Sequence, residues 1–123
     1  MNDIAADDIG SHEGDEAMLA MFNKVDVAIK EANTQAIGAA AGKITKDDLL
    51  RVAIAVSRFR ANYLAAVLRL AKLSGTELPS QSEIAELRRV RLVYEEGLEG
   101  FGALRHALGR GYFTLAEKEL EPV

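Results

Sequence analysis

The chain has 123 residues, a net charge of −4, two prolines, no tryptophan and no cysteine. This length is typical of one domain, and the absence of cysteine excludes disulfides and thiolate metal sites. The N-terminus lacks the basic start and apolar stretch of a signal peptide. The longest aliphatic run, Val52 to Val56, is far too short to span a bilayer. We therefore expect a cytoplasmic protein with no membrane segment.

The first residues differ from the rest in charge. Residues 1–16 hold six acidic and no basic side chains, whereas residues 43–111 hold twelve basic and eight acidic ones. Residues 1–13 mix Asp, Gly, Ser and Ala without a period, which is typical of a disordered or loosely attached segment. We expect an acidic tail over residues 1–13 and a single helical-bundle domain over residues 14–123.

The first predicted helix runs from about Asp15 to Ala41. Its apolar residues recur at alternating steps of three and four, which is the helical period. They are Met18, Phe22, Val25, Ile29, Ala32, Ala36 and Ala39. Large side chains at the start of this row give way to alanine at its end. Gly42 follows as the predicted C-cap.

The second predicted helix continues to about Ser74. Thr45 is its predicted N-cap, and Asp47 and Asp48 suit the positive end of the helix dipole. One apolar row comprises Leu49, Val52, Val56, Phe59, Tyr63, Ala66, Leu70 and Leu73, and a second comprises Leu50, Ala53, Leu64, Val67 and Ala71. So wide an apolar face predicts that this helix is covered on more than one side.

The third predicted helix begins after Pro79, with Ser80 or Ser82 as its N-cap. Ser80 with Glu83 matches the capping-box pattern. The apolar row comprises Leu87, Val90, Tyr94, Gly97, Phe101, Leu104, Leu108 and Gly111. We expect residues 112–120 to add a further helical turn.

These elements predict an all-α fold, an up-down-up bundle of three long antiparallel helices with a short C-terminal helical turn. In such a bundle the ends of the first and third helices share a pole, and both are rich in small residues. A pocket there would be lined by Ala36, Ala39, Gly97, Phe101 and Leu104. This pocket supports one alternative function, a small-ligand sensor.

Five of the ten glycines fall between Gly97 and Gly111. Gly97 and Gly111 lie on the apolar row, where a missing side chain allows close packing. Gly102 and Gly109 lie beside His106 on the opposite face, where only an outside partner could use the space. We therefore expect the surface around Gly100, Gly102 and His106 to contact a partner.

Five basic residues and no acidic one lie between Leu49 and Thr76. Arg51, Arg58, Arg69 and Lys72 share one stripe, and the first three of these are further candidates for partner contact. Such a stripe could also attract nucleic-acid phosphates, a second alternative that we do not favour, because the chain is acidic overall. Glu95, Glu96, Glu99 or the N-terminal tail could neutralise the stripe instead.

No catalytic or cofactor motif is visible. Gly38 to Thr45 resembles a phosphate-binding loop, but only three residues separate its glycines and Ile44 follows the lysine. The two histidines cannot build a polyhistidine metal site, and no nucleophile motif is present. We expect no enzyme activity, cofactor or metal. The best-supported function is protein–protein interaction as an adaptor, chaperone-like or regulatory homodimer.

Overall fold

The computed structural model describes the backbone of residues 2–74 and 77–117, and the side chains of residues 13–72 and 77–117. Its described residues form three helices and no β-strand, so the predicted all-α fold of three long helices is confirmed. The chain forms two structural units, Met1–Gly42 and Lys43–Val123. The sequence did not predict a boundary at Gly42, and the division into a tail 1–13 and a domain 14–123 stays a prediction.

The first unit is the single helix α1, Asn2–Ala41. It begins well before the predicted start near Asp15. Its end matches the prediction. Gly42 adopts a φ of 67°, and its N–H donates to the carbonyl of Gly38 at 3.0 Å. This is the αL form of helix termination, which favours glycine because it has no Cβ.

The second unit is a hairpin of α2, Lys46–Ser74, and α3, Gln81–Gly109. Both helices begin with reciprocal side-chain caps. The N–H of Asp48 donates to Thr45 Oγ1 at 3.0 Å, and the N–H of Thr45 donates to Asp48 Oδ2 at 2.9 Å. Ser80 and Glu83 make the same exchange at 3.1 and 3.0 Å. Thr45 and Ser80 are therefore confirmed as N-caps.

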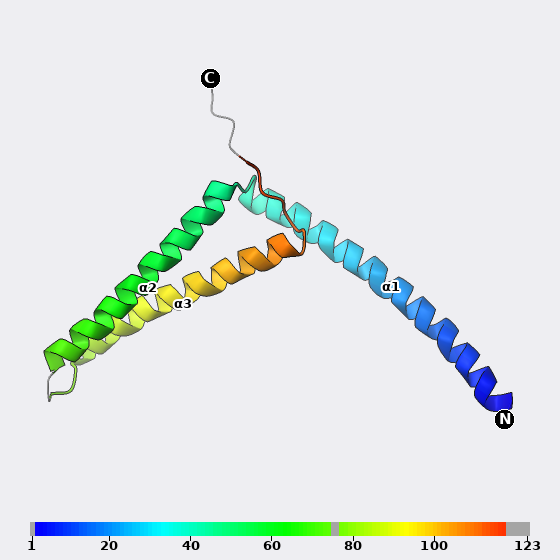
Figure 1. Cartoon of the computed structure of the whole chain (residues 1–123), viewed down its shortest axis with the longest axis horizontal. Helices are drawn as coiled ribbons and strands as arrows, with labels where there is room; N and C mark the ends of the chain where they lie inside the picture. Colours follow the sequence, from blue (N-terminus) through cyan, green and yellow to red (C-terminus); the bar gives the residue numbers. More distant parts are fainter. Residues whose placement is uncertain (1, 75–76, 118–123) are drawn as a thin grey trace, which may run out of the picture. The chain divides into compact units, whose positions relative to one another are not determined.

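The two helices of the hairpin run antiparallel and side by side (Figure 1). Their register follows from two contacts. Tyr63 stacks on Tyr94 with ring centroids 6.0 Å apart, and Phe59 lies against Gly97. A Cβ built on Gly97 would lie only 2.8 Å from Phe59 Cδ2, so the missing side chain is what admits the phenylalanine ring. The predicted packing role of Gly97 is confirmed.

The end of α3 is a Schellman motif. The N–H of Tyr112 donates to the carbonyl of Ala107 at 2.9 Å, and that of Gly111 donates to Leu108 at 3.0 Å. Gly111, with a φ of 75°, supplies the left-handed residue that this motif needs. It was predicted to lie on the apolar row of the helix, but it lies outside the helix and ends it.

The predicted C-terminal helical turn does not form over residues 112–117; residues 118–120 of that prediction lie outside the described residues. The chain instead runs back to the start of α2 (Figure 1). The N–H of Ala116 donates to Ile44 at 2.9 Å, and that of Lys46 donates to Ala116 at 3.2 Å, which forms a parallel bridge between Thr45 and Ala116. Gly111 turns the chain out of the helical path, so these amides find their partners across the hairpin.

The choice between two serines gives a stability test. Replacing Ser80 with alanine removes the cap of α3 and should lower the free energy of unfolding by about 1 kcal/mol. The matched change Ser82→Ala removes a hydroxyl that no hydrogen bond uses for capping, and should stay within about 0.5 kcal/mol. Urea unfolding followed by circular dichroism measures both. Equal losses would contradict the assignment of Ser80 as the cap.

The caps also predict a pH dependence. Hydrogen bonds from the backbone and side chain of Thr45 lower the pKa of Asp48, and those of Ser80 lower the pKa of Glu83. A carboxyl with a lowered folded pKa stabilises the fold above its unfolded pKa of about 4 and loses that contribution as the pH falls through the folded value. Melting temperature should therefore fall between about pH 5 and pH 3. In Asp48→Asn/Glu83→Gln the fall should be smaller, and an unchanged profile would contradict this account.

Candidate functional site

The hairpin leaves one row of large apolar side chains on α2 exposed. We call Leu50, Ile54, Leu64 and Leu68 the α2 apolar face. Leu64 is 53% exposed and Leu68 is 61% exposed, although α3 packs on the neighbouring side of the same helix. With Ser57, Ala61 and Ala71, these residues recur at steps of four and three, the spacing of a coiled-coil seam. The α2 apolar face is therefore built like a helix-packing surface that has no partner within the hairpin.

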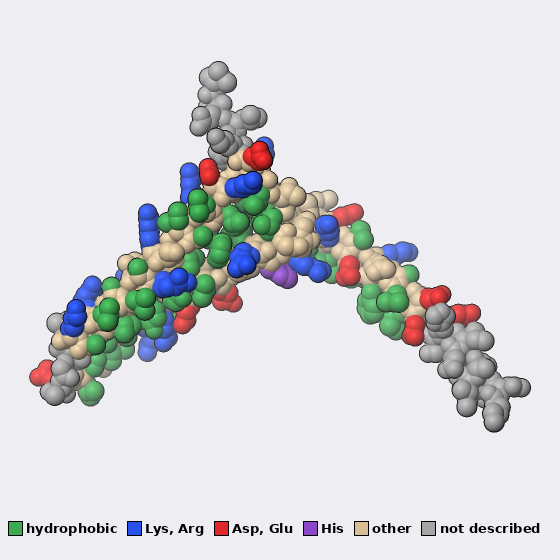
Figure 2. Space-filling model, viewed as in Figure 1, with side chains coloured by type: hydrophobic (Ala, Val, Ile, Leu, Met, Phe, Trp, Pro, Cys, Tyr) green, Lys and Arg blue, Asp and Glu red, His purple; other side chains and the backbone are tan. Residues whose placement is uncertain are grey.

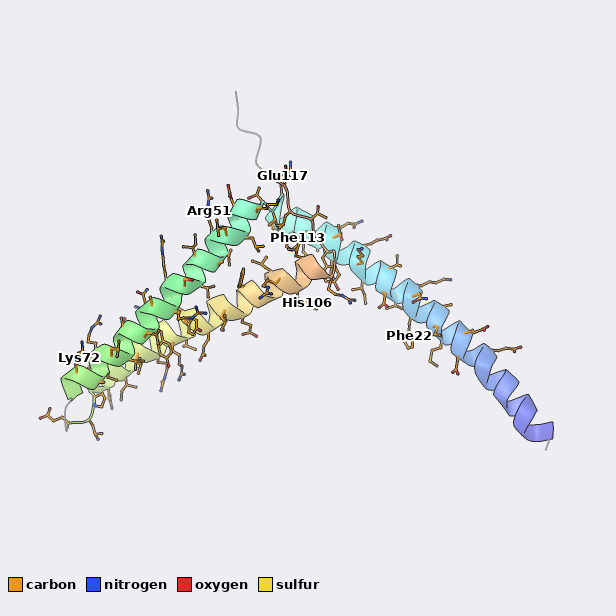
Figure 3. The ribbon with its side chains drawn as sticks, in the orientation of Figure 1. Phe22, Arg51, Lys72, His106, Phe113 and Glu117 are labelled. Atoms are coloured by element: carbon orange, nitrogen blue, oxygen red, sulfur yellow. The ribbon has the colours of Figure 1, made fainter. Side chains whose placement is uncertain are left out.

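Helix α1 carries a similar row. We call Met18, Phe22, Val25 and Ile29 the α1 apolar face. Each of these side chains is roughly half exposed. Figure 2 shows hydrophobic side chains gathered on α1, in the region where Figure 3 labels Phe22. None of the described side chains of α1 is buried.

Burial within the described residues is confined to two side chains, Val56 and Thr45. Val56 lies on the α2 row that faces α3, next to the contact between Phe59 and Gly97. A two-helix hairpin encloses little volume, and a unit of this size rarely gains much stability from so small a core. The exposed rows thus offer apolar surface that the core of the hairpin does not use.

Basic side chains border the α2 apolar face. We call Arg51, Arg58, Arg69 and Lys72 the basic stripe. All four are exposed, and Figure 2 shows Lys and Arg side chains along the outer edge of α2. In the heptad that places Leu50 and Leu64 at d, Arg51, Arg58 and Lys72 occupy e positions. Charges at e positions decide which helix a coiled-coil seam accepts.

The described acidic residues of α3 form no ion pair with this stripe. Glu86 pairs with Arg89 at 2.7 Å and Glu95 pairs with Arg91 at 3.7 Å, so both ion pairs stay within α3. The hydrogen bond from Arg89 lowers the pKa of Glu86, and the positive charge of Arg69, in the basic stripe, lowers it further. Among the described residues, no ion pair joins α2 to α3. The predicted neutralisation by Glu95 is therefore not found within the hairpin.

The fifth base of α2 has a different environment. Arg60 donates from Nε to the hydroxyl of Tyr94 at 3.2 Å, and its guanidinium carbon lies 5.4 Å from the centre of that ring. This contact ties α2 to α3 beside the stacked tyrosines. Arg60 thus stabilises the hairpin, whereas Arg58 is free to meet a partner.

The glycine-rich part of α3 is helical as far as Gly109, so the helix does not end early. His106, labelled in Figure 3, is exposed, and so are Gly100 and Gly102. A Cβ built on Gly100 or Gly102 would meet nothing within 4 Å. The predicted exposure of this surface is confirmed, and its contact with a partner stays a prediction.

The predicted pocket stays a prediction, because Ala36 and Ala39 belong to one unit and Gly97, Phe101 and Leu104 to the other. Two small hollows lie between α2 and α3. One, of about 170 Å³, has Ala66 and Leu87 in its lining, and one of about 200 Å³ lies beside Phe59 and Val93. Both are smaller than the roughly 300 Å³ of a typical ligand pocket.

No protein-family model matches the chain, and neither a search of curated proteins nor one of solved structures returned a similar protein. Over the described residues, no helix has the length and apolar character needed to cross a bilayer. No three His, Asp or Glu side chains of that part of the chain cluster as metal ligands would.

Sequence reasoning found part of this site. It identified the basic stripe and placed Leu50 and Leu64 in a second apolar row. It missed Ile54 and Leu68, because it followed the neighbouring row through Ala53 and Val67. The sequence does contain the pattern that identifies them, the four-three spacing from Leu50 to Ala71. That pattern can be separated from the neighbouring apolar row once the row that faces α3 is known.

The glycines of α3 give a matched prediction. Gly102→Ala should raise the free energy of unfolding by about 1 kcal/mol, because alanine is the better helix former and its Cβ meets nothing. Gly97→Ala gains the same propensity but crowds Phe59, so it should lie roughly 1–3 kcal/mol below the Gly102 variant. Urea unfolding of the two variants measures the difference. Equal gains would show that Gly97 is not needed for packing.

Proposed function

We propose that this protein acts through protein–protein interaction and that it forms a homodimer. The observation that carries the proposal is the exposure of two four-residue apolar faces, one on each unit, at the spacing of helix-packing seams. Large exposed apolar patches on soluble proteins mark sites of protein–protein interaction. The absence of enzyme activity and the cytoplasmic location expected from the sequence belong to the same proposal.

Energetics support an assembly over an isolated chain. Covering the exposed half of a large apolar side chain contributes about 1 kcal/mol. The α1 and α2 apolar faces together offer eight such side chains per chain, five of them leucine or isoleucine. A two-fold dimer uses every patch twice, because each subunit presents the same surface. Self-association covers both faces without a second gene product.

The roles that fit such a dimer are those of an adaptor, a chaperone-like protein or a regulator. Its remaining surface would be free for other proteins. Gly102 and His106 lie exposed on α3, on the side away from the row that packs on α2, and Gly100 lies exposed at the edge of that row. All three are candidates for that second contact.

Light scattering tests the proposal. The wild-type chain should give a molar mass twice the 13.3 kDa of one chain. Leu64→Asp places a charge on the α2 apolar face and should yield monomers, whereas Leu78→Asp, at a residue that is 93% exposed, should leave the dimer intact. Circular dichroism checks that each variant stays helical. A wild-type mass of one chain would refute the homodimer.

A further inference from the structure

The basic stripe limits what can cover the α2 apolar face. Helix α2 holds no acidic residue after Asp48, and three of its four e positions on this seam are basic. In an antiparallel pair e positions face each other, so two copies of α2 would bring Arg51, Arg58 and Lys72 against like charges. The occupant must therefore be an apolar helix with acidic flanks.

Helix α1 has that composition. Asp15 and Asp26 lie about 50–70° round the helix from the centre of the α1 apolar face, on the same flank. Both are exposed. The bases of this stretch, Lys24 and Lys30, lie farther round the helix. The α1 apolar face is thus bordered by carboxylates on one side, as the α2 apolar face is bordered by guanidinium groups.

The spacing of these charges also matches. Asp15 and Asp26 are eleven residues apart, and so are Arg58 and Arg69. Eleven residues are about three helical turns, or roughly 16 Å along the axis. When α1 runs antiparallel to α2, Asp26 lies opposite Arg58 while Asp15 lies opposite Arg69.

In the same register, part of the α1 apolar face lies opposite small side chains of α2. Phe22 and Val25 fall opposite the stretch of α2 that holds Ser57 and Ala61. Met18 falls between Leu64 and Leu68, and Ile29 falls beside Ile54. Large side chains opposite small ones let two helices interdigitate as knobs into holes.

We propose that helix α1 of a second copy docks antiparallel on the α2 apolar face, with Asp26 against Arg58 and Asp15 against Arg69. This inference rests on the proposed homodimer. The exchange is reciprocal, since each copy offers one α1 and one α2. The α1 apolar face, most of the α2 apolar face, and Arg58 and Arg69 of the basic stripe are thereby covered in a closed two-fold assembly.

Cysteine cross-linking tests the register, because the chain has no native cysteine. Asp26→Cys and Arg58→Cys are purified as separate single variants, mixed in equal amounts and oxidised. A disulfide-linked species of doubled mass that needs both variants is the expected result. The control mixture, Asp26→Cys with Arg88→Cys on the outer face of α3, should not cross-link above each variant alone. If the first mixture does not cross-link although light scattering gives the mass of a dimer, the proposed register is wrong. The proposed homodimer would not be affected by that result.

Charge exchange gives a second measurement. Arg58→Glu should raise the dimer dissociation constant about 3- to 30-fold, because two exposed pairs per dimer become repulsive. Adding Asp26→Lys to the same chain should restore most of the affinity, and Arg88→Glu should change little. If the double variant does not regain dimer affinity, the proposal is overturned. It is also overturned if the protein retards duplex DNA in a gel shift and Arg58→Glu abolishes that retardation, since the basic stripe would then bind nucleic acid.

Discussion

Two helices packed side by side can each bury only one face, and this constraint governs the rest of the structure. In the hairpin, that single face is the row from Val56 through Phe59 and Tyr63 on α2, set against Tyr94 and Gly97 on α3. Helix α2 has apolar residues on two sides, so one side remains outside the contact. The exposed face is a consequence of how the sequence is patterned, and the proposed association starts from it.

The hairpin compensates for its small core at its open end. Gly111 ends α3, and residues 112–117 return to pair with Ile44 and Lys46, where Thr45 is both the cap of α2 and one of the two buried side chains. Figure 3 labels Phe113 on this returning segment. One short segment thus joins the end of α3 to the start of α2 through backbone hydrogen bonds, at the end of the hairpin away from its loop.

Local rules predicted much of this fold. The four-three spacing gave the three helices, Ser80 and Thr45 were recognised as caps from their neighbours Glu83 and Asp48, and Gly97 was placed at a close approach. The return of residues 112–117 could not be predicted, because a bridge between Ala116 and Thr45 depends on contacts far apart in sequence. The exposure of Ile54 and Leu68 was missed for a related reason. Two overlapping apolar rows on α2 do not reveal which one α3 occupies until the register is known.

The central claim is that the exposed apolar faces are covered by association, so that folding and assembly are linked. Urea unfolding of the wild-type chain over about a hundredfold range of protein concentration tests it most directly. If the dimer is the stable form, each tenfold rise in concentration should add about 1.4 kcal/mol to the apparent stability of the dimer and move the midpoint to higher urea. A midpoint that does not change with concentration would contradict the account.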